Sequence, residues 1–194
     1  INYEDLELSM IDKRSNESSH LKSDLQYYKS FMEWGMDGET NAFLEEVFLW
    51  LSENLPLSPN PKKLCWGDSR IGNVLFEDFQ VKSLLDWEMA TIGDPLCDLA
   101  WGLTTDDVSS YGLNIEKLPG SIANEEAIKF WEKNTGFSAD NFFYYRILCL
   151  FKFSVIMIRV AKKLIHNEIM PLDSDFHVNN HVSNYLRQEF NEKN

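Results

Sequence analysis

The sequence predicts an α+β fold that is mostly helical and has one small β-hairpin near the middle of the chain. Apolar residues recur at helical spacing on both sides of that middle part, most clearly in residues 41–54. Between the helical segments the pattern changes, because "VLF" (74–76) and "VKSLLD" (81–86) flank the polar stretch "EDFQ". With 194 residues, 44% of them hydrophobic and 13% aromatic, the chain can bury a core of its own.

Start and stop signals bound the predicted helices. The first helix ends near Gly35 to Gly38, and "LPLSPNP" stops the second. Pro95 lies in the first turn of the helix that begins with "LCDLAWGL", where a missing N–H costs little. Asn124 is the expected N-cap of the next helix and Gly136 its stop. The remaining expectations are helices over 20–36, 41–54, 138–170 (one helix or a pair) and 174–190, and a loop over 105–121.

The charge of the chain excludes two classes of partner. It has 18 basic and 31 acidic residues, a formal net charge of −13, which argues against a nucleic-acid groove and against an anionic membrane surface. The most apolar stretch, residues 147–160, contains Lys152 and Arg159 and is too short to span a bilayer. Local cations or a bound metal would therefore have to meet any polyphosphate ligand.

Cysteine usage indicates a reducing compartment. Cys65, Cys97 and Cys149 are odd in number, widely spaced and set among apolar neighbours. We therefore expect a cytoplasmic protein without a disulfide framework or a zinc site. The chain begins with Ile1 instead of methionine, which suggests a fragment.

Polar residues suited to phosphoryl transfer flank the predicted hairpin. Asp68 and Asn73 lie in "LCWGDSRIGNVLF", and Asp86 ends the second strand at the start of "DWEMATIGDPLCDLAW". Carboxylate and amide oxygens suit Mg²⁺, and a base with two metal ligands makes up the catalytic half of a phosphoryl-transfer site. Arg70 would add positive charge beside the transferred group. The alternative for each Asp or Asn taken singly is a turn-forming residue at a hairpin end.

Three elements in order, "WGDSRIGN", "LLDWE" after a hairpin, and "GDPLCDLAW", resemble the C-terminal lobe of the aminoglycoside phosphotransferase-like superfamily, distant relatives of protein kinases. Within that superfamily, these elements are most similar to bacterial phosphotransferases. Those phosphotransferases are related to superfamily members that are fused to, or encoded near, acyl-CoA dehydrogenases. The resemblance implies that residues 1–194 form a kinase-like C-lobe, with a catalytic loop at 64–76 and a metal-binding loop at 84–98. Residues 1–67 lack a glycine-rich strand pair and a strand lysine, so the N-terminal nucleotide-binding lobe is expected to be absent from this chain.

The resemblance assigns chemistry to four residues. Asp68 is similar to the catalytic base that orients the acceptor hydroxyl. Asn73 and Asp86 are similar to the Mg²⁺ ligands through which ATP is bound. Arg70 stands where kinases carry a phosphate-contacting lysine, which implies a part in both catalysis and nucleotide binding.

Three further residues would support this group. By resemblance, Glu88 reaches a second metal or its water. Asp98 accepts hydrogen bonds from the backbone of the Trp66–Asp68 segment and holds the catalytic loop in shape. Trp66 stands where most of the family has histidine, in a packing role.

The implied function is that of the C-lobe of an ATP-dependent, Mg²⁺-requiring O-phosphotransferase that acts on an alcohol group of a small molecule. The acidic surface suits a cationic acceptor such as an aminoglycoside or an amino alcohol, whereas the resemblance favours a hydroxyacyl compound. Without its N-lobe the chain is expected to fold but to be inactive.

The alternative is a non-catalytic, kinase-like module for protein interaction. The presence of Asp68, Asn73 and Asp86 favours the enzyme, and the missing lobe favours the module. In both cases the surface that an N-lobe would cover should be exposed and apolar, and this would promote self-association.

Overall fold

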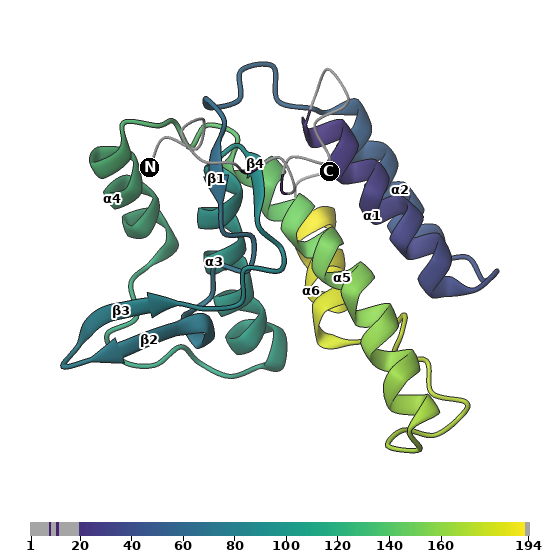
Figure 1. Ribbon diagram of the computed structural model, residues 1–194. Coiled ribbons are helices and arrows are strands. Elements are labelled where there is room, and N and C mark those ends of the chain that lie inside the picture. The colour runs from purple at the N-terminus through teal and green to yellow at the C-terminus, as the bar shows by residue number, and fades with distance from the viewer. Residues whose placement is uncertain (1–7, 9–10, 12–19, 193–194) are drawn as a thin grey trace.

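The computed structural model describes residues 8, 11 and 20–192 (Figure 1). Six α-helices, two 3₁₀ helices and two small sheets make up this part of the chain, so the predicted mostly helical α+β class is confirmed. The helices are α1 (His20–Met36), α2 (Ala42–Glu53), η3 (Ile71–Asn73), α3 (Leu96–Ser110), η4 (Tyr111–Leu113), α4 (Asn124–Thr135), α5 (Phe142–His166) and α6 (His181–Asn191). The strands are β1 (Lys63–Cys65), β2 (Val74–Glu77), β3 (Gln80–Leu84) and β4 (Thr91–Gly93).

Helix α5 is the centre of the fold. It contacts α1, α2, α3 and α6, and Figure 1 shows α1 and α2 together on one flank of it. Its side chains Tyr145, Phe151 and Ile158 are fully buried in a core shared by all five of these helices. The predicted helical segment 138–170 is therefore one helix, because its apolar residues face neighbours on several sides.

The predicted hairpin is confirmed as β2 and β3, which pair antiparallel and project from the helical body (Figure 1). A second antiparallel pair, β1 with β4, was not expected. Its strands have three residues each, too few to show a period in the sequence. Since β1 leads into the Trp66–Asn73 segment and β4 follows Asp86, this pairing brings the two polar loops to the same place.

Helix α3 corrects the expected loop at 105–121, because it continues to Ser110. Its buried Asp107 accepts from Arg146 of α5 at 2.6 Å. Asn124 is not the N-cap of α4. Ala123 occupies that position, and the Asn124 amide instead donates to Asp107 at 2.7 Å. Tertiary pairing has thus overridden local sequence signals in both places.

The last helix begins later than expected, at His181 instead of residue 174. Asn180 caps it by accepting from the backbone of Val182 and Ser183. In the described part of the chain no helix combines the length and apolar character needed to cross a membrane. The three cysteines are unpaired thiols, as expected.

Candidate active site

The carboxylate of Asp68 is held on both oxygens. Oδ2 accepts from Asn73 Nδ2 at 2.7 Å and from Arg70 Nε at 3.0 Å, and Oδ1 accepts from Trp101 Nε1 at 2.7 Å. Its side chain is 14% exposed, so it is nearly enclosed yet reachable from solvent. Hydrogen bonds from three sides fix the orientation of this carboxylate.

Asp86 lies at the same end of the hairpin as Asn73. The backbone N–H of Leu85 donates to the backbone oxygen of Asn73 at 2.8 Å, and Asp86 follows in a left-handed conformation with φ 59°. Asp86 and Glu88 are both exposed in this turn. The backbone therefore brings the 84–98 segment against the 64–76 segment.

The donor set suits Mg²⁺. Asn73 donates its Nδ2 to the carboxylate and to the backbone oxygen of Asp68, which leaves Oδ1 as its ligand atom. Within residues 8, 11 and 20–192, no three His, Cys, Asp or Glu side chains gather as a metal site. A hard ion held by one carboxylate and one amide oxygen would complete its shell with water and phosphate oxygens, as Mg²⁺ commonly does.

Asp98, in the first turn of α3, holds the 64–76 segment. It accepts from the backbone N–H groups of Trp66 at 2.7 Å and Gly67 at 2.8 Å, the hydrogen bonds that the resemblance implied. Ser69 Oγ adds a bond of 2.6 Å to the backbone oxygen of Asp98. Burial raises the pKa of Asp98, and the two N–H groups oppose that rise.

Asp98→Asn is expected to reduce the free energy of unfolding by about 1–2 kcal/mol. An amide has a single acceptor oxygen, so its NH₂ group would face one of the two backbone donors. Urea denaturation measures the loss. Asp140→Asn, at an exposed position, is the control and should stay within about 0.5 kcal/mol of wild type. A loss no larger than the control's would contradict the role of Asp98 in the loop.

Gly67 permits the sharp turn that aims Asp68. Its φ is +89°, and a Cβ at this position would lie 2.2 Å from the backbone oxygen of Met89. We expect Gly67→Ala to destabilise the fold by at least about 2 kcal/mol. The matched control is Gly72→Ala in the same loop, where a Cβ meets no atom within 4 Å, and thermal unfolding should show it near wild type. Equal melting temperatures for the two variants would rule out this constraint.

Trp66 connects the two loops. Its Nε1 donates to the backbone oxygen of Leu85 at 2.7 Å, and its ring lies 6.0 Å from that of Trp87. Trp66 therefore has a positional function: it fixes the segment before Asp86 against the segment before Asp68.

Two residues of the site region were not anticipated from the sequence. Trp101 contacts Asp68 directly, but a tryptophan in an apolar helix resembles core. Asp94 accepts from the backbone N–H of Leu96 at the start of α3 and from the Tyr145 hydroxyl, at 2.9 Å each. An acid two residues before an apolar helix is a capping signal that could have identified Asp94.

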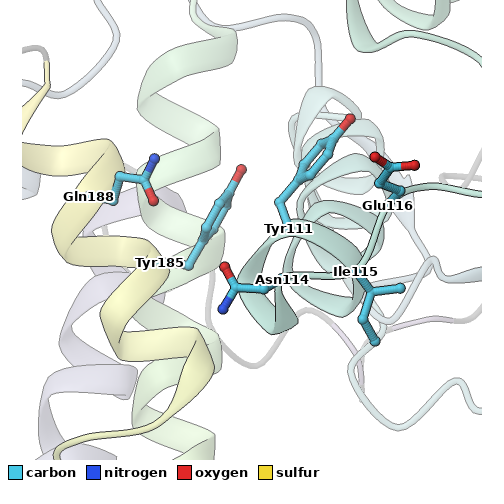
Figure 2. A pocket seen from close by; sticks show the side chains of 6 residues that line it. All are labelled: Tyr111, Asn114, Ile115, Glu116, Tyr185 and Gln188. Atoms are coloured by element: carbon cyan, nitrogen blue, oxygen red, sulfur yellow. The ribbon is translucent and has the colours of Figure 1, made fainter.

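The surface hollows of the described residues differ in whether a candidate site residue lines them. One of about 700 Å³ is lined by residues 69–72, by residues of α3 between Gly102 and Ser109, and by Leu118, Ser121 and Ile122. Another, of about 470 Å³, lies between α6 and the segment after α3, and Figure 2 shows Tyr185 and Tyr111 on its two sides. Arg70 lines the first hollow and none of the candidate site residues lines the second, so the first is the one beside the candidate site.

Comparison with known proteins identifies the class. Residues 7–131 match the model of the phosphotransferase enzyme family, and the chain belongs to that family. The fold is shared with a solved structure from Ralstonia eutropha assigned to the aminoglycoside phosphotransferases. The TM-score is 0.72 at 17% identity, over 97% of this chain and 57% of that one.

The sequence relatives are larger proteins. Acyl-CoA dehydrogenase family member 11 of Pongo abelii is 32% identical over 124 residues, which is 58% of this chain and 16% of the relative. The protein of that name from Gallus gallus is 33% identical over 138 residues, 64% of this chain and 18% of the relative. Acyl-CoA dehydrogenase family member 10 of Mus musculus is 26% identical over 172 residues, which is 82% of this chain and 16% of the relative. The chain thus spans about a sixth of these relatives.

Proposed function

We propose that this chain is the catalytic half of an ATP-dependent, Mg²⁺-requiring phosphotransferase that phosphorylates a hydroxyl group of a small molecule. The observation that carries the proposal is the carboxylate of Asp68, oriented by three hydrogen bonds beside a surface hollow. The metal-suited Asn73 contacts this carboxylate, and the backbone brings Asp86 to the same end of the hairpin.

Each residue has a role in the proposed reaction. Asp68 orients the acceptor hydroxyl and receives its proton as the hydroxyl oxygen attacks the γ-phosphorus, the bond from phosphorus to the β,γ-bridging oxygen breaks, and ADP leaves. Asn73 and Asp86 are the ligands for Mg²⁺, with Glu88 beside them as a further carboxylate. When bound, Mg²⁺ supplies neutralisation of charge on the β- and γ-phosphates.

Arg70 is suited to the transferred phosphoryl group. Its side chain is 52% exposed, and Nε contacts Asp68. A guanidinium has five N–H donors, so four are left for phosphate oxygens. Arg70 can therefore stay paired with the base while it stabilises the charge that develops on the phosphoryl group.

A second lobe would complete the nucleotide site. The chain corresponds to 57% of the solved neighbour, and apolar side chains are exposed along the hairpin and the segment after it: Leu75, Phe76, Phe79, Val81, Leu84, Leu85 and Trp87. We propose that a nucleotide-covering lobe from polypeptide outside residues 1–194 contacts this surface. In its absence the same surface would promote self-association.

The hollow beside Arg70 favours an acceptor with an apolar part. Its lining includes Ile71, Leu103, Leu118 and Ile122. The carboxylate in this lining, Asp106, is paired with Lys117 at 2.7 Å, so its charge is compensated. A hydroxyacyl compound therefore suits the hollow better than an amino alcohol or a polycationic aminoglycoside.

Calorimetric titration with Mg²⁺–ATP and measurement of ADP release over a panel of acceptors test the proposal. In the complete protein that contains this chain, release should depend on a hydroxyacyl acceptor. The 194-residue chain alone should bind Mg²⁺–ATP only in about the millimolar range and should show no turnover. Micromolar affinity with acceptor-dependent turnover in the chain alone would refute the need for a second lobe.

The exposed hairpin favours a second candidate, a non-catalytic interaction module. That function predicts a complete protein that binds a protein partner through the hairpin and releases no ADP with any acceptor. Phe79→Ser, at the fully exposed tip, should then abolish partner binding and leave the fold unchanged.

A further inference from the structure

We infer, resting on the proposed function, that Trp101 is a positioning residue for the carboxylate of Asp68. We further infer that the buried ion pair of Lys152 with Asp24 holds the Trp101 indole in place. Neither contact follows from the motif that contains Asp68, because Trp101 lies on α3, Lys152 on α5 and Asp24 on α1.

The indole of Trp101 is a rigid donor. Its side chain is in the second turn of α3, the residue is 4% exposed, and Nε1 lies 2.7 Å from Asp68 Oδ1. The two donors to Oδ2 have further roles in the proposed reaction. Arg70 is half-exposed and is proposed to bind phosphate, and Asn73 is proposed to bind the metal. Trp101 is the donor of the three that has no task in the reaction besides holding the carboxylate.

The chemistry of an indole N–H suits a base. It can donate but cannot accept a hydrogen bond, so it binds an oxygen of the carboxylate and never competes for the proton that Asp68 receives. Held through Oδ1, the carboxylate keeps Oδ2 on the side of Arg70 and Asn73. Reactivity depends steeply on such placement, and a shift of about 1 Å can reduce a rate a hundredfold.

A buried cation packs against the same indole. Lys152 Nζ lies 5.9 Å from the centroid of the Trp101 ring and 4.8 Å from that of Tyr28. The ammonium is paired with Asp24 Oδ2 at 3.1 Å, and both side chains are buried. The ring of Phe153 adds a contact at 5.9 Å. Cation–π and aromatic contacts from α5 thus hold the ring whose N–H reaches Asp68, and Asp24 and Tyr28 of α1 hold the Lys152 ammonium in turn.

The first test needs no enzymatic activity. In a proton–nitrogen spectrum of this chain, Trp101→Phe identifies the indole N–H resonance of Trp101 among the six tryptophans. Asp68→Asn should move that resonance clearly and leave the Trp131 resonance unchanged, because Trp131 lies in α4 and packs on Phe137, just after that helix. A Trp101 resonance that does not respond to Asp68→Asn would overturn the contact.

The second test measures catalysis in the complete protein. Trp101→Phe keeps an aromatic ring against Lys152 and removes the N–H, so kcat should fall about 10- to 100-fold while the KM for Mg²⁺–ATP stays within twofold. Trp131→Phe is the control and should leave both constants unchanged. An unchanged kcat in Trp101→Phe would overturn the positioning role. Absence of turnover in the wild type would instead contradict the proposed function, and the spectral shift would still decide the contact.

Discussion

Asp68→Asn in the complete protein is expected to reduce the rate of acceptor phosphorylation by about 10³-fold while the affinity for Mg²⁺–ATP changes by less than about twofold. The amide keeps the shape of the side chain and can still accept from Trp101, but it cannot receive the proton of the hydroxyl. In the proposed geometry the base contacts the acceptor and not the nucleotide. Single-turnover kinetics gives the rate, and calorimetry gives the affinity.

Asp86→Ala should show the opposite division of effects. It removes a proposed carboxylate ligand of the metal, so Mg²⁺–ATP affinity itself should fall by tenfold or more, worth about 1.4 kcal/mol. Asp78→Asn is the matched control, because Asp78 is exposed at the far turn of the same hairpin. Equal losses of nucleotide affinity in Asp68→Asn and Asp86→Ala would contradict the separate roles of base and metal ligand.

Local patterns predicted those parts of the fold that local energetics determine. Residues 20–36 show helical spacing and form α1 with the same bounds, and the change to short apolar runs located β2 and β3. The extent of α3 was not predictable in this way. Residues 105–110 are polar except for Val108, and they are helical because Asp107 pairs with Arg146, 39 positions away.

The same distinction holds for the site. Asp68, Asn73 and Asp86 flank the hairpin in the sequence, and the pairing of its strands brings Asn73 and Asp86 to one end of it, because a hairpin fixes which residues are opposite each other. The bond from Trp101 to Asp68 joins residues 33 positions apart on different elements. Neither hydrophobic periodicity nor a capping residue in the sequence indicates such a contact. The hydrogen-bond donors to the Asp68 carboxylate could therefore be identified only from the structure.

Asp24→Asn is expected to destabilise the chain by about 3 kcal/mol or more. The change keeps the volume of the side chain and removes the carboxylate charge that faces the buried ammonium of Lys152 at 3.1 Å. A buried charge without a counter-charge costs far more than an exposed one, whereas replacement of both partners by apolar residues is often neutral. The double variant Asp24→Leu with Lys152→Met should therefore regain most of the loss, as measured by urea denaturation.

The dependence of unfolding free energy on pH distinguishes the loss of this charge pair from a loss of packing alone. In the wild type, burial lowers the pKa of Lys152, but the charge of Asp24 together with the neighbouring Tyr28, Cys97 and Cys149 more than offsets this, so the pKa stands above its usual value. The pair therefore stabilises the fold below the unfolded pKa of about 10.4, and the contribution is lost as the pH rises through the folded pKa. In Asp24→Asn the effect of burial on Lys152 is larger than the remaining favourable interactions, so the folded-state pKa of Lys152 falls below its unfolded-state pKa. Between these two pKa values the unfolded chain binds more protons than the folded chain, so the stability of the variant rises with pH. The difference in unfolding free energy between wild type and variant should shrink between pH 7 and pH 10, while the double variant should show little of this change. A difference that stays constant over this range would mean that Lys152 is not held as a buried cation beneath Trp101.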